Sequence, residues 1–260
     1  MEKIGVFDSG VGGLSILREL VFQIPWADYV YVADIAHLPF GDREPEEILQ
    51  IASALTRWLV SQHCNAVVMA CNISSAVALR EVRKKYLIPI FGVLQGGIRK
   101  ALMSTKNRKI GVLTTTATLK SGVIQKFFEN TPYSSVIQDC PEWVPLIEKS
   151  EAFLPENRPV FEKYIRRLQE AEVDTILPAC THYLLILPLL VEIAGEGITV
   201  IDPSPEVVRE VATVFPSRNS YSAGSLEFHL TAPSETFVEM AQKILGRPIS
   251  VQVMEQAITG

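Results

Sequence analysis

Two cysteines, Cys71 and Cys180, are the residues whose type and position best suit chemistry. Each directly follows a short apolar run, residues 66–70 and 175–179, and small polar residues come next. A thiol has an ordinary pKa near ~8.5, and a nearby cation or helix amino terminus favours the thiolate, which can act as a base. Two thiols that face each other across a cleft could remove and return a proton at one carbon from opposite sides. A single buried cysteine is usually inert core packing, so the catalytic interpretation depends on the pairing.

The residues beside the two cysteines extend this pattern. Asn72 and Ile73 follow Cys71, whereas Thr181 and His182 follow the second cysteine. An imidazole two residues after a thiol can lie beside it and tune its ionisation. The pattern therefore predicts two similar half-sites.

A glycine-rich stretch begins at Asp8 and Ser9, between an apolar run and a helical pattern. Gly10 and Gly12 fit part of a dinucleotide fingerprint, but Ser15 occupies the third glycine position. Asp8 would also place a negative charge beside a pyrophosphate. We therefore favour a small ligand that carries a carboxylate and an ammonium group, held by backbone amides, over a dinucleotide. A helix that is simply capped by Ser9 is the structural alternative.

Two further segments are candidates. The segment 34–43 contains Phe40 and Gly41 and follows a predicted strand, so it could be a binding loop or only a surface turn. Glu148 lies in an apolar setting after Cys140, where a capping role or a salt bridge is the ordinary expectation.

Strand-like apolar runs alternate with amphipathic helical patterns along the whole chain. This alternation predicts an α/β protein with largely parallel sheets, in which ligands bind at the carboxyl ends of the strands. The predicted strands are 3–8, 28–33, 66–70, 89–93, 109–114, 134–138, 174–179 and 198–202. The predicted helices are 12–23, 45–62, 74–86, 95–104, 120–129, 157–170, 184–193, 205–213 and 234–245.

The chain also shows signs of internal duplication. Residues 4–10 correspond to residues 110–116, and the two cysteine segments follow at a similar spacing. We expect a first α/β domain of residues 1–95 plus 206–260 with Asp8 and Cys71. The second domain, residues 96–205, would contain Cys180 and His182, with the active site in the cleft between the two.

Composition limits the function classes. The 260 residues are 48% hydrophobic and 20% charged, with a formal net charge of −5, so nothing indicates nucleic acid as a partner. No apolar run approaches a membrane span, and the chain enters a strand at once, so we expect a cytoplasmic protein without a membrane partner. The cysteines and histidines lack closely spaced ligand pairs, which predicts no metal site.

The order of these motifs resembles the glutamate racemase family, part of the wider aspartate/glutamate racemase group. The segments that carry the resemblance are residues 7–13, 33–36, 39–41, 70–72, 140–141, 144–148, 179–183 and 237–246. The resemblance implies two pseudo-symmetric α/β domains and racemisation of L- and D-glutamate without cofactor or metal. It further implies a product used in bacterial peptidoglycan synthesis, and it is compatible with a homodimer.

The same resemblance implies roles for individual residues. Cys71 would remove the α-proton of D-glutamate and Cys180 that of L-glutamate, assisted by Asp8 and His182 respectively. Glu148 matches a family carboxylate near the site. The implied substrate-binding residues are Asp8, Ser9, Phe40, Gly41, Asn72, Ile73, Thr181 and His182.

Three positions depart from the family pattern. Ile73 replaces the usual threonine, Phe40 the usual tyrosine, and Leu184 the usual proline. Ile73 removes a hydroxyl from the substrate shell, which predicts weaker glutamate binding. Three alternatives remain: a racemase of another acidic amino acid such as aspartate, a catalytically weak homologue that only binds an amino acid or a partner, and a nicotinamide-dependent oxidoreductase.

Overall fold

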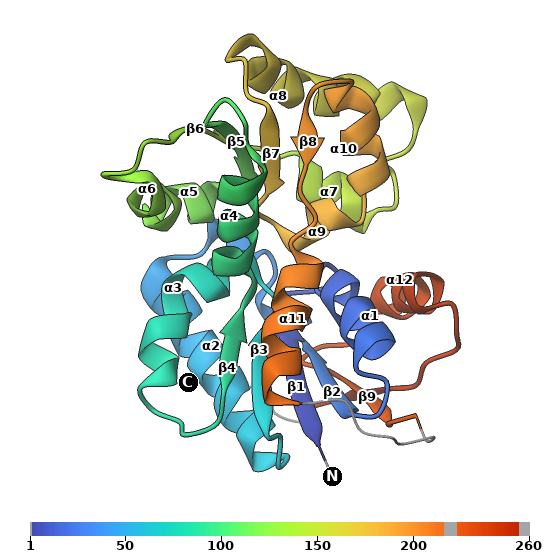
Figure 1. Ribbon diagram of the computed structural model, residues 1–260. Helices are drawn as coiled ribbons and strands as arrows, with labels where there is room; N and C mark the ends of the chain where they lie inside the picture. Colours follow the sequence, from blue (N-terminus) through green and yellow to red (C-terminus); the bar gives the residue numbers. More distant parts are fainter. Residues whose placement is uncertain (1, 216–222, 255–260) are drawn as a thin grey trace.

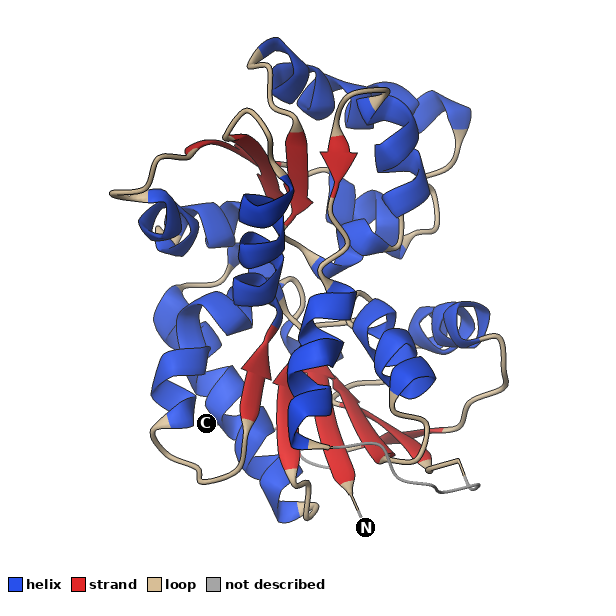
Figure 2. Cartoon of the chain, in the orientation of Figure 1, coloured by secondary structure: helices blue, strands red, loops and turns tan. Residues whose placement is uncertain are grey.

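Two parallel β-sheets, each flanked by helices, form the two lobes of the protein (Figure 1). The computed structural model describes residues 2–215 and 223–254, so parts of the predicted segment 206–260 lie outside the described residues. The strand arrowheads of one sheet point toward those of the other across the middle of the molecule (Figure 2). Both sets of carboxyl ends therefore converge on one region.

The first sheet has six strands in the order β10-β9-β2-β1-β3-β4. All of its neighbouring strands are parallel. Its strands are β1 (Lys3–Asp8), β2 (Asp28–Ala33), β3 (Ala66–Met69), β4 (Ile90–Gly92), β9 (Leu226–Leu230) and β10 (Val251–Val253).

The second sheet has four parallel strands in the order β6-β5-β7-β8. Its strands are β5 (Lys109–Thr114), β6 (Ser134–Asp139), β7 (Thr175–Pro178) and β8 (Thr199–Val200). This order repeats the order β2-β1-β3-β4 of the first sheet, strand for strand. The repeat agrees with the duplication expected from the sequence.

Helices cover both faces of each sheet (Figure 2). They are α1 (Leu14–Gln23), α2 (Pro45–Ser61), α3 (Asn72–Arg83), α4 (Val93–Ser104), α5 (Thr116–Lys120), α6 (Val123–Phe128), α7 (Trp143–Glu148), α8 (Arg158–Glu170), α9 (Thr181–Leu184), α10 (Leu187–Ala194), α11 (Ser204–Val214) and α12 (Glu235–Leu245). Short 3₁₀ turns span Ile35–His37, Phe40–Asp42 and Pro155–Asn157. Within residues 2–215 and 223–254, no helix has the length and apolarity needed to cross a membrane.

Strand β3 shows why the apolar runs form central strands. Ala66 and Val68 face one hydrophobic core, whereas Val67 and Met69 face the core on the opposite side of the sheet. A strand covered on both faces has no polar side, so its sequence is continuously apolar. Because β3 is held between the two cores, the position of Cys71 just beyond its carboxyl end is fixed as well.

The structure corrects several element predictions. The predicted helix 120–129 corresponds to α6, which begins only at Val123 because Gly122 adopts a left-handed conformation (φ +66°) directly before it. The short helix α5 before this turn was not predicted. The predicted helix 184–193 corresponds to α10, which begins at Leu187 and has Pro188 in its first turn. The short helix α9 was not predicted apart from its last residue, Leu184. Helix α7 and strands β9 and β10 were not predicted, and they are short elements whose residues are partly exposed.

The described part of the carboxyl-terminal tail packs on the first sheet. Strand β9 pairs in parallel with β2, and Leu230 lies opposite Ala33. Helix α12 contributes Phe237 and Ala241 to the core that also contains β1 and α1. The tail therefore extends the first sheet beyond the repeated four strands.

Candidate active site

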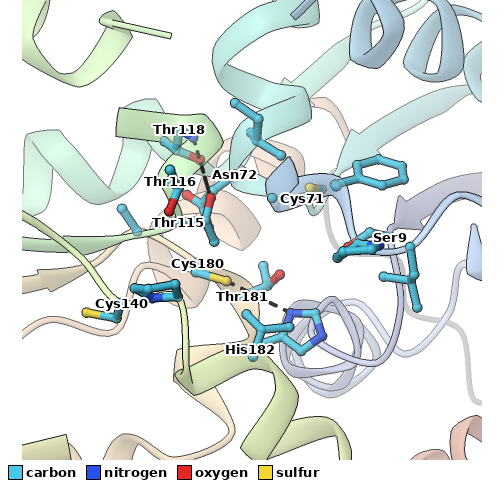
Figure 3. A pocket seen from close by; sticks show the side chains of 18 of the residues that line it. Ser9, Cys71, Asn72, Thr115, Thr116, Thr118, Cys140, Cys180, Thr181 and His182 are labelled. Atoms are coloured by element: carbon cyan, nitrogen blue, oxygen red, sulfur yellow. Dashed lines mark hydrogen bonds between the residues drawn. The ribbon is translucent and has the colours of Figure 1, made fainter. Parts of the chain in front are cut away.

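One cavity of about 280 Å³ lies where the carboxyl ends of the two sheets meet. The residues that line it follow six different strands, three from each sheet. The lining comprises Ser9, Leu38, Pro39, Phe40, Gly41, Cys71, Asn72, Ile73, Thr115, Thr116, Thr118, Cys140, Pro141, Val144, Pro145, Glu148, Ala179, Cys180, Thr181 and His182. Figure 3 shows both cysteines among them.

Cys71 lies at the N-cap position of α3, two residues after the last residue of β3. The residue is only 5% exposed, although its side chain lines the cavity. Burial, reinforced by the negative charge of Asp8, raises the pKa of the Cys71 thiol to about 12. Cys71 is therefore a neutral thiol at neutral pH, ready to donate a proton.

Cys180 occupies the corresponding position before α9, after the end of β7. His182 Nδ1 lies 3.9 Å from its sulfur, and His182 Nε2 lies 2.5 Å from Glu148 Oε1 (Figure 3 shows the first contact). Burial alone would lower the pKa of His182, but hydrogen bonds with Cys180 and Glu148 raise it well above its ordinary value. The second half-site thus places an imidazolium cation beside its thiol.

Tyr183 fixes the short helix that carries His182. Its ring is fully buried, and its hydroxyl lies 3.0 Å from the carbonyl oxygen of Thr114 and 3.2 Å from that of Cys140. Thr114 is the last residue of β5, and Cys140 follows the last residue of β6. Tyr183 therefore anchors the helix that carries His182 to the second sheet.

Asp8 lies beneath the cavity rather than in its lining. Its carboxylate accepts hydrogen bonds from the backbone amides of Gly13 at 2.9 Å and Gly10 at 3.2 Å, and from the Thr181 hydroxyl at 3.2 Å. Burial raises the pKa of Asp8, and the positive charge of His182 only partly offsets this effect. Since two loop amides are already bonded to Asp8, they are not free to bind a pyrophosphate, which weakens the dinucleotide interpretation.

Polar groups of the lining are free to bind a ligand. The Nδ2 donor of Asn72 is buried and has no hydrogen-bond partner in the protein. Ser9 brings a hydroxyl from the first lobe, and the first turn of α3 presents backbone amides at the same cavity, whereas the Thr181 hydroxyl from the second lobe already donates to Asp8. Such a group of donors suits a carboxylate.

The remaining predicted residues also reach the cavity. Phe40 and Gly41 lie on the loop after β2, and Ile73 lies in the first turn of α3. Phe40 and Ile73 are 3% and 4% exposed, so both are wall residues. Glu148, for which the sequence predicts a capping role or a salt bridge, forms an ion pair with His182 inside this wall.

Several lining residues were not predicted as site residues. Thr115 follows the end of β5 as the N-cap of α5, and Thr118 lies in α5, where the two hydroxyl oxygens are 3.0 Å apart (Figure 3). Thr116 and Cys140 line the same side, and burial raises the pKa of the Cys140 thiol. The duplication contained the missing signal, because the offset that aligns residue 4 with residue 110 also aligns Ser9 with Thr115.

Metal binding finds no support in the part of the chain that the structure describes. No three side chains of histidine, cysteine, aspartate or glutamate gather there in a way that could hold an ion. The cavity-lining side chains of Glu148 and His182 instead form an ion pair with each other.

Comparison with known proteins agrees with this geometry. A glutamate racemase of Synechocystis sp. is 39% identical over 250 residues, which are 94% of this chain and 89% of that protein. The crystal structure of a glutamate racemase isoform from Bacillus anthracis superposes with a TM-score of 0.89 at 28% identity, covering 98% of both chains. The glutamate racemase from Francisella tularensis in complex with D-glutamate gives a TM-score of 0.88 at 25% identity, with 98% and 97% covered.

A sequence profile of one enzyme family matches residues 9–211 and so includes both cysteine motifs. The resemblance seen in the sequence is confirmed by this match, by the relatives and by the shared architecture. The chain belongs to the Asp/Glu/Hydantoin racemase family.

Proposed function

We propose that this protein interconverts L- and D-glutamate by a two-thiol mechanism that needs no cofactor. The observation that carries the proposal is the placement of Cys71 and Cys180 after corresponding strands of the two sheets, in the lining of one cavity. Relatives named glutamate racemase across most of the chain support glutamate as the substrate.

The protons move between sulfur and carbon in each direction. From L-glutamate, the Cys180 thiolate takes the α-proton and the neutral Cys71 thiol delivers its own proton to the opposite face. From D-glutamate the two sulfurs exchange these roles, so the product leaves the thiols in the opposite protonation state. An imidazolium beside Cys180 stabilises negative charge on that sulfur.

The α-proton of an amino acid is a far weaker acid than a thiol. The site must therefore stabilise carbanion-like charge with donors that are already oriented in a closed, largely dry cavity. We assign this role to Asn72 and Ser9, with the first-turn amides of α3 holding a substrate carboxylate. The Thr181 hydroxyl donates its hydrogen to Asp8, so we assign it to accept a hydrogen bond from the substrate ammonium group. We assign Asp8 and Glu148 as positioning residues, the first through Thr181 and the second through His182.

Four further predictions belong to the same proposal. The first domain would comprise residues 1–95 plus 206–260 and the second residues 96–205. The protein would act in the cytoplasm, would be compatible with a homodimer, and would supply D-glutamate for peptidoglycan.

Deuterium exchange tests the proposal directly. The reduced protein is incubated in D₂O with L- or D-glutamate, and the α-proton signal and the optical activity are followed together. We expect both to disappear, and we expect Cys71→Ser and Cys180→Ser each to lower the racemisation rate by about 10²–10⁴-fold. Cys64→Ser is the matched control, because Cys64 is buried in the core outside the cavity lining.

The results distinguish the alternatives. Absence of exchange with either glutamate enantiomer in folded protein would refute glutamate racemisation. Exchange with aspartate instead would favour the second candidate, which the bulk of Ile73 in the wall supports. Serine variants as active as the parent would exclude the two-thiol mechanism.

A further inference from the structure

The loop that carries Phe40 and Gly41 is tied to a residue almost two hundred positions later in the chain. Strand β2 ends at Ala33 and strand β9 ends at Leu230, and these two residues are register partners. The next residues, Asp34 and Thr231, therefore leave the sheet side by side. The tail strand thus delivers a hydroxyl to the base of the loop.

Thr231 makes two hydrogen bonds with that loop. Its hydroxyl donates to Asp34 Oδ1 at 2.7 Å and accepts the backbone N–H of Ala36 at 3.0 Å. Asp34 is fully buried and also contacts His37, whose Nδ1 lies 2.8 Å from both carboxylate oxygens. An unpaired buried carboxylate is costly, so these contacts hold the loop base in one arrangement.

The anchored segment leads directly into the cavity wall. Leu38, Phe40 and Gly41 line the cavity only a few residues after the Thr231 contacts. The loop also approaches the other lobe, since a Cβ added at Gly41 would lie 3.7 Å from Thr115 Cβ. A displacement at Ala36 would therefore change the width of the cavity between the lobes.

We propose that Thr231, which lies outside the cavity, is a positioning residue that sets substrate affinity through Asp34 and Ala36. The inference rests on the proposed racemase function for its kinetic consequence. The holding of the loop itself has a separate readout. The proposal assigns the tail a role in the reaction besides extending the sheet.

Thr231→Val tests this role, because it preserves the shape of the side chain and removes both hydrogen bonds. We expect amide exchange of residues 35–41 to become about 10-fold faster or more, and KM for glutamate to rise about 3- to 30-fold with kcat within threefold. Thr231→Ser retains the hydroxyl and should restore both properties. Thr56→Val is the matched control, because Thr56 is equally buried and bonds only within α2, to the carbonyl oxygen of Ala52.

Two results would overturn the role of Thr231. One is amide exchange in Thr231→Val that stays within twofold of the parent, and the other is an equal rise in KM in Thr56→Val. A parent protein inactive on glutamate would refute the proposed function, and amide exchange alone would then decide whether Thr231 holds the loop. Hydrogen exchange in the ligand-free protein does not depend on the substrate.

Discussion

Cys71 and Cys180 differ in the charges around their sulfur atoms. Asp8 lies near Cys71 and contributes to the raised pKa of its thiol, whereas His182 lies 3.9 Å from the Cys180 sulfur. The two half-sites therefore share a backbone position but not an electrostatic environment. In the free protein, only the second half-site places a positively charged imidazole beside its sulfur.

The raised pKa of Cys71 makes the stability of the protein depend on alkaline pH. The folded state favours the neutral thiol up to about pH 12, while in the unfolded chain the thiol ionises above ~8.5. The stabilisation from the buried Cys71 thiol is therefore complete at pH values below the pKa of the unfolded state. It is lost as the pH rises toward and through the pKa of the folded state. We expect the free energy of unfolding of the parent to fall relative to Cys71→Ser by up to about 1.4 kcal/mol per pH unit above pH 9.

Denaturant unfolding at pH 8, 9 and 10 measures this difference. Parallel pH profiles for the parent and Cys71→Ser would contradict it. Cys64, whose pKa burial raises to about 11, serves as a second case, and Cys64→Ser should reduce the same alkaline loss.

Ile73 gives a prediction about affinity. Its side chain lines the cavity at the first turn of α3, where a hydroxyl could bond the substrate. Restoring one hydrogen bond contributes roughly 0.5–1.5 kcal/mol, so Ile73→Thr should lower KM for glutamate by about 2- to 12-fold. Ile73→Val keeps the branched apolar shape and should leave KM unchanged. An unchanged or higher KM in Ile73→Thr would contradict the prediction.

Two glycines in turns between elements matter for different reasons. A Cβ on Gly12, before α1, would lie 2.6 Å from Thr181 Oγ1 and 2.7 Å from the backbone nitrogen of His182. A Cβ on Gly122 would meet nothing within 4 Å, but its φ of +66° is unfavourable for other residues. The first glycine permits contact between the lobes, and the second only permits a turn.

We therefore expect opposite outcomes from the two alanine variants. Gly12→Ala should displace His182 and lower kcat/KM by about 100-fold. Gly122→Ala should leave kcat/KM unchanged and destabilise the fold by about 1 kcal/mol. Kinetics and denaturant unfolding on both variants measure the two effects. Full activity in Gly12→Ala would mean that α9 can shift without harm.

The sequence predicted the central strands because burial on both faces leaves a continuous apolar run. It missed β9, where Glu227 and His229 interrupt the apolar residues of a strand near the sheet edge. It also missed the four-residue helix α9, and it began the next helix at Leu184 although α10 begins at Leu187. Strand β9 was missed because a partly exposed element needs less apolar sequence, and α9 was missed because four residues are too few to show a helical period.

The sequence predicted most of the residues of the candidate site, but it did not predict that Asp8 would be buried beneath the cavity. Both cysteines and their neighbours reach the cavity, as expected for residues at strand ends. The burial of Asp8 could not be predicted, because it depends on the amides of Gly10 and Gly13 turning back onto its carboxylate. The bond of Asp8 to Thr181 depends on how the two sheets face each other.

The molecule as a whole has its binding cavity between two separately built sheets. A ligand that contacts both lobes should stabilise them together. At about 100 times its Kd, glutamate should stabilise the protein by about 2.7 kcal/mol and raise the Tm by roughly 5–10 °C.

Asn72 provides the test of where this ligand binds. Asn72→Asp replaces an unpartnered donor with a negative charge, so the Tm shift with glutamate should disappear. Asn157→Asp introduces the same charge outside the cavity lining, where Asn157 donates to the carbonyl oxygen of Glu151, and should retain the shift. A retained shift in Asn72→Asp would place the ligand elsewhere.

The tail strands also change how the protein can meet other chains. In the first sheet, β9 covers the edge that β2 would otherwise expose, whereas in the second sheet β6 pairs only with β5 among the described residues. An open edge can recruit a strand from a neighbouring molecule and start aggregation. Strand β6 begins with Ser134 and Ser135 and ends with Gln138 and Asp139, so polar side chains protect an edge that no tail covers. Replacing these residues with valine would turn the uncovered edge into a site for association between molecules.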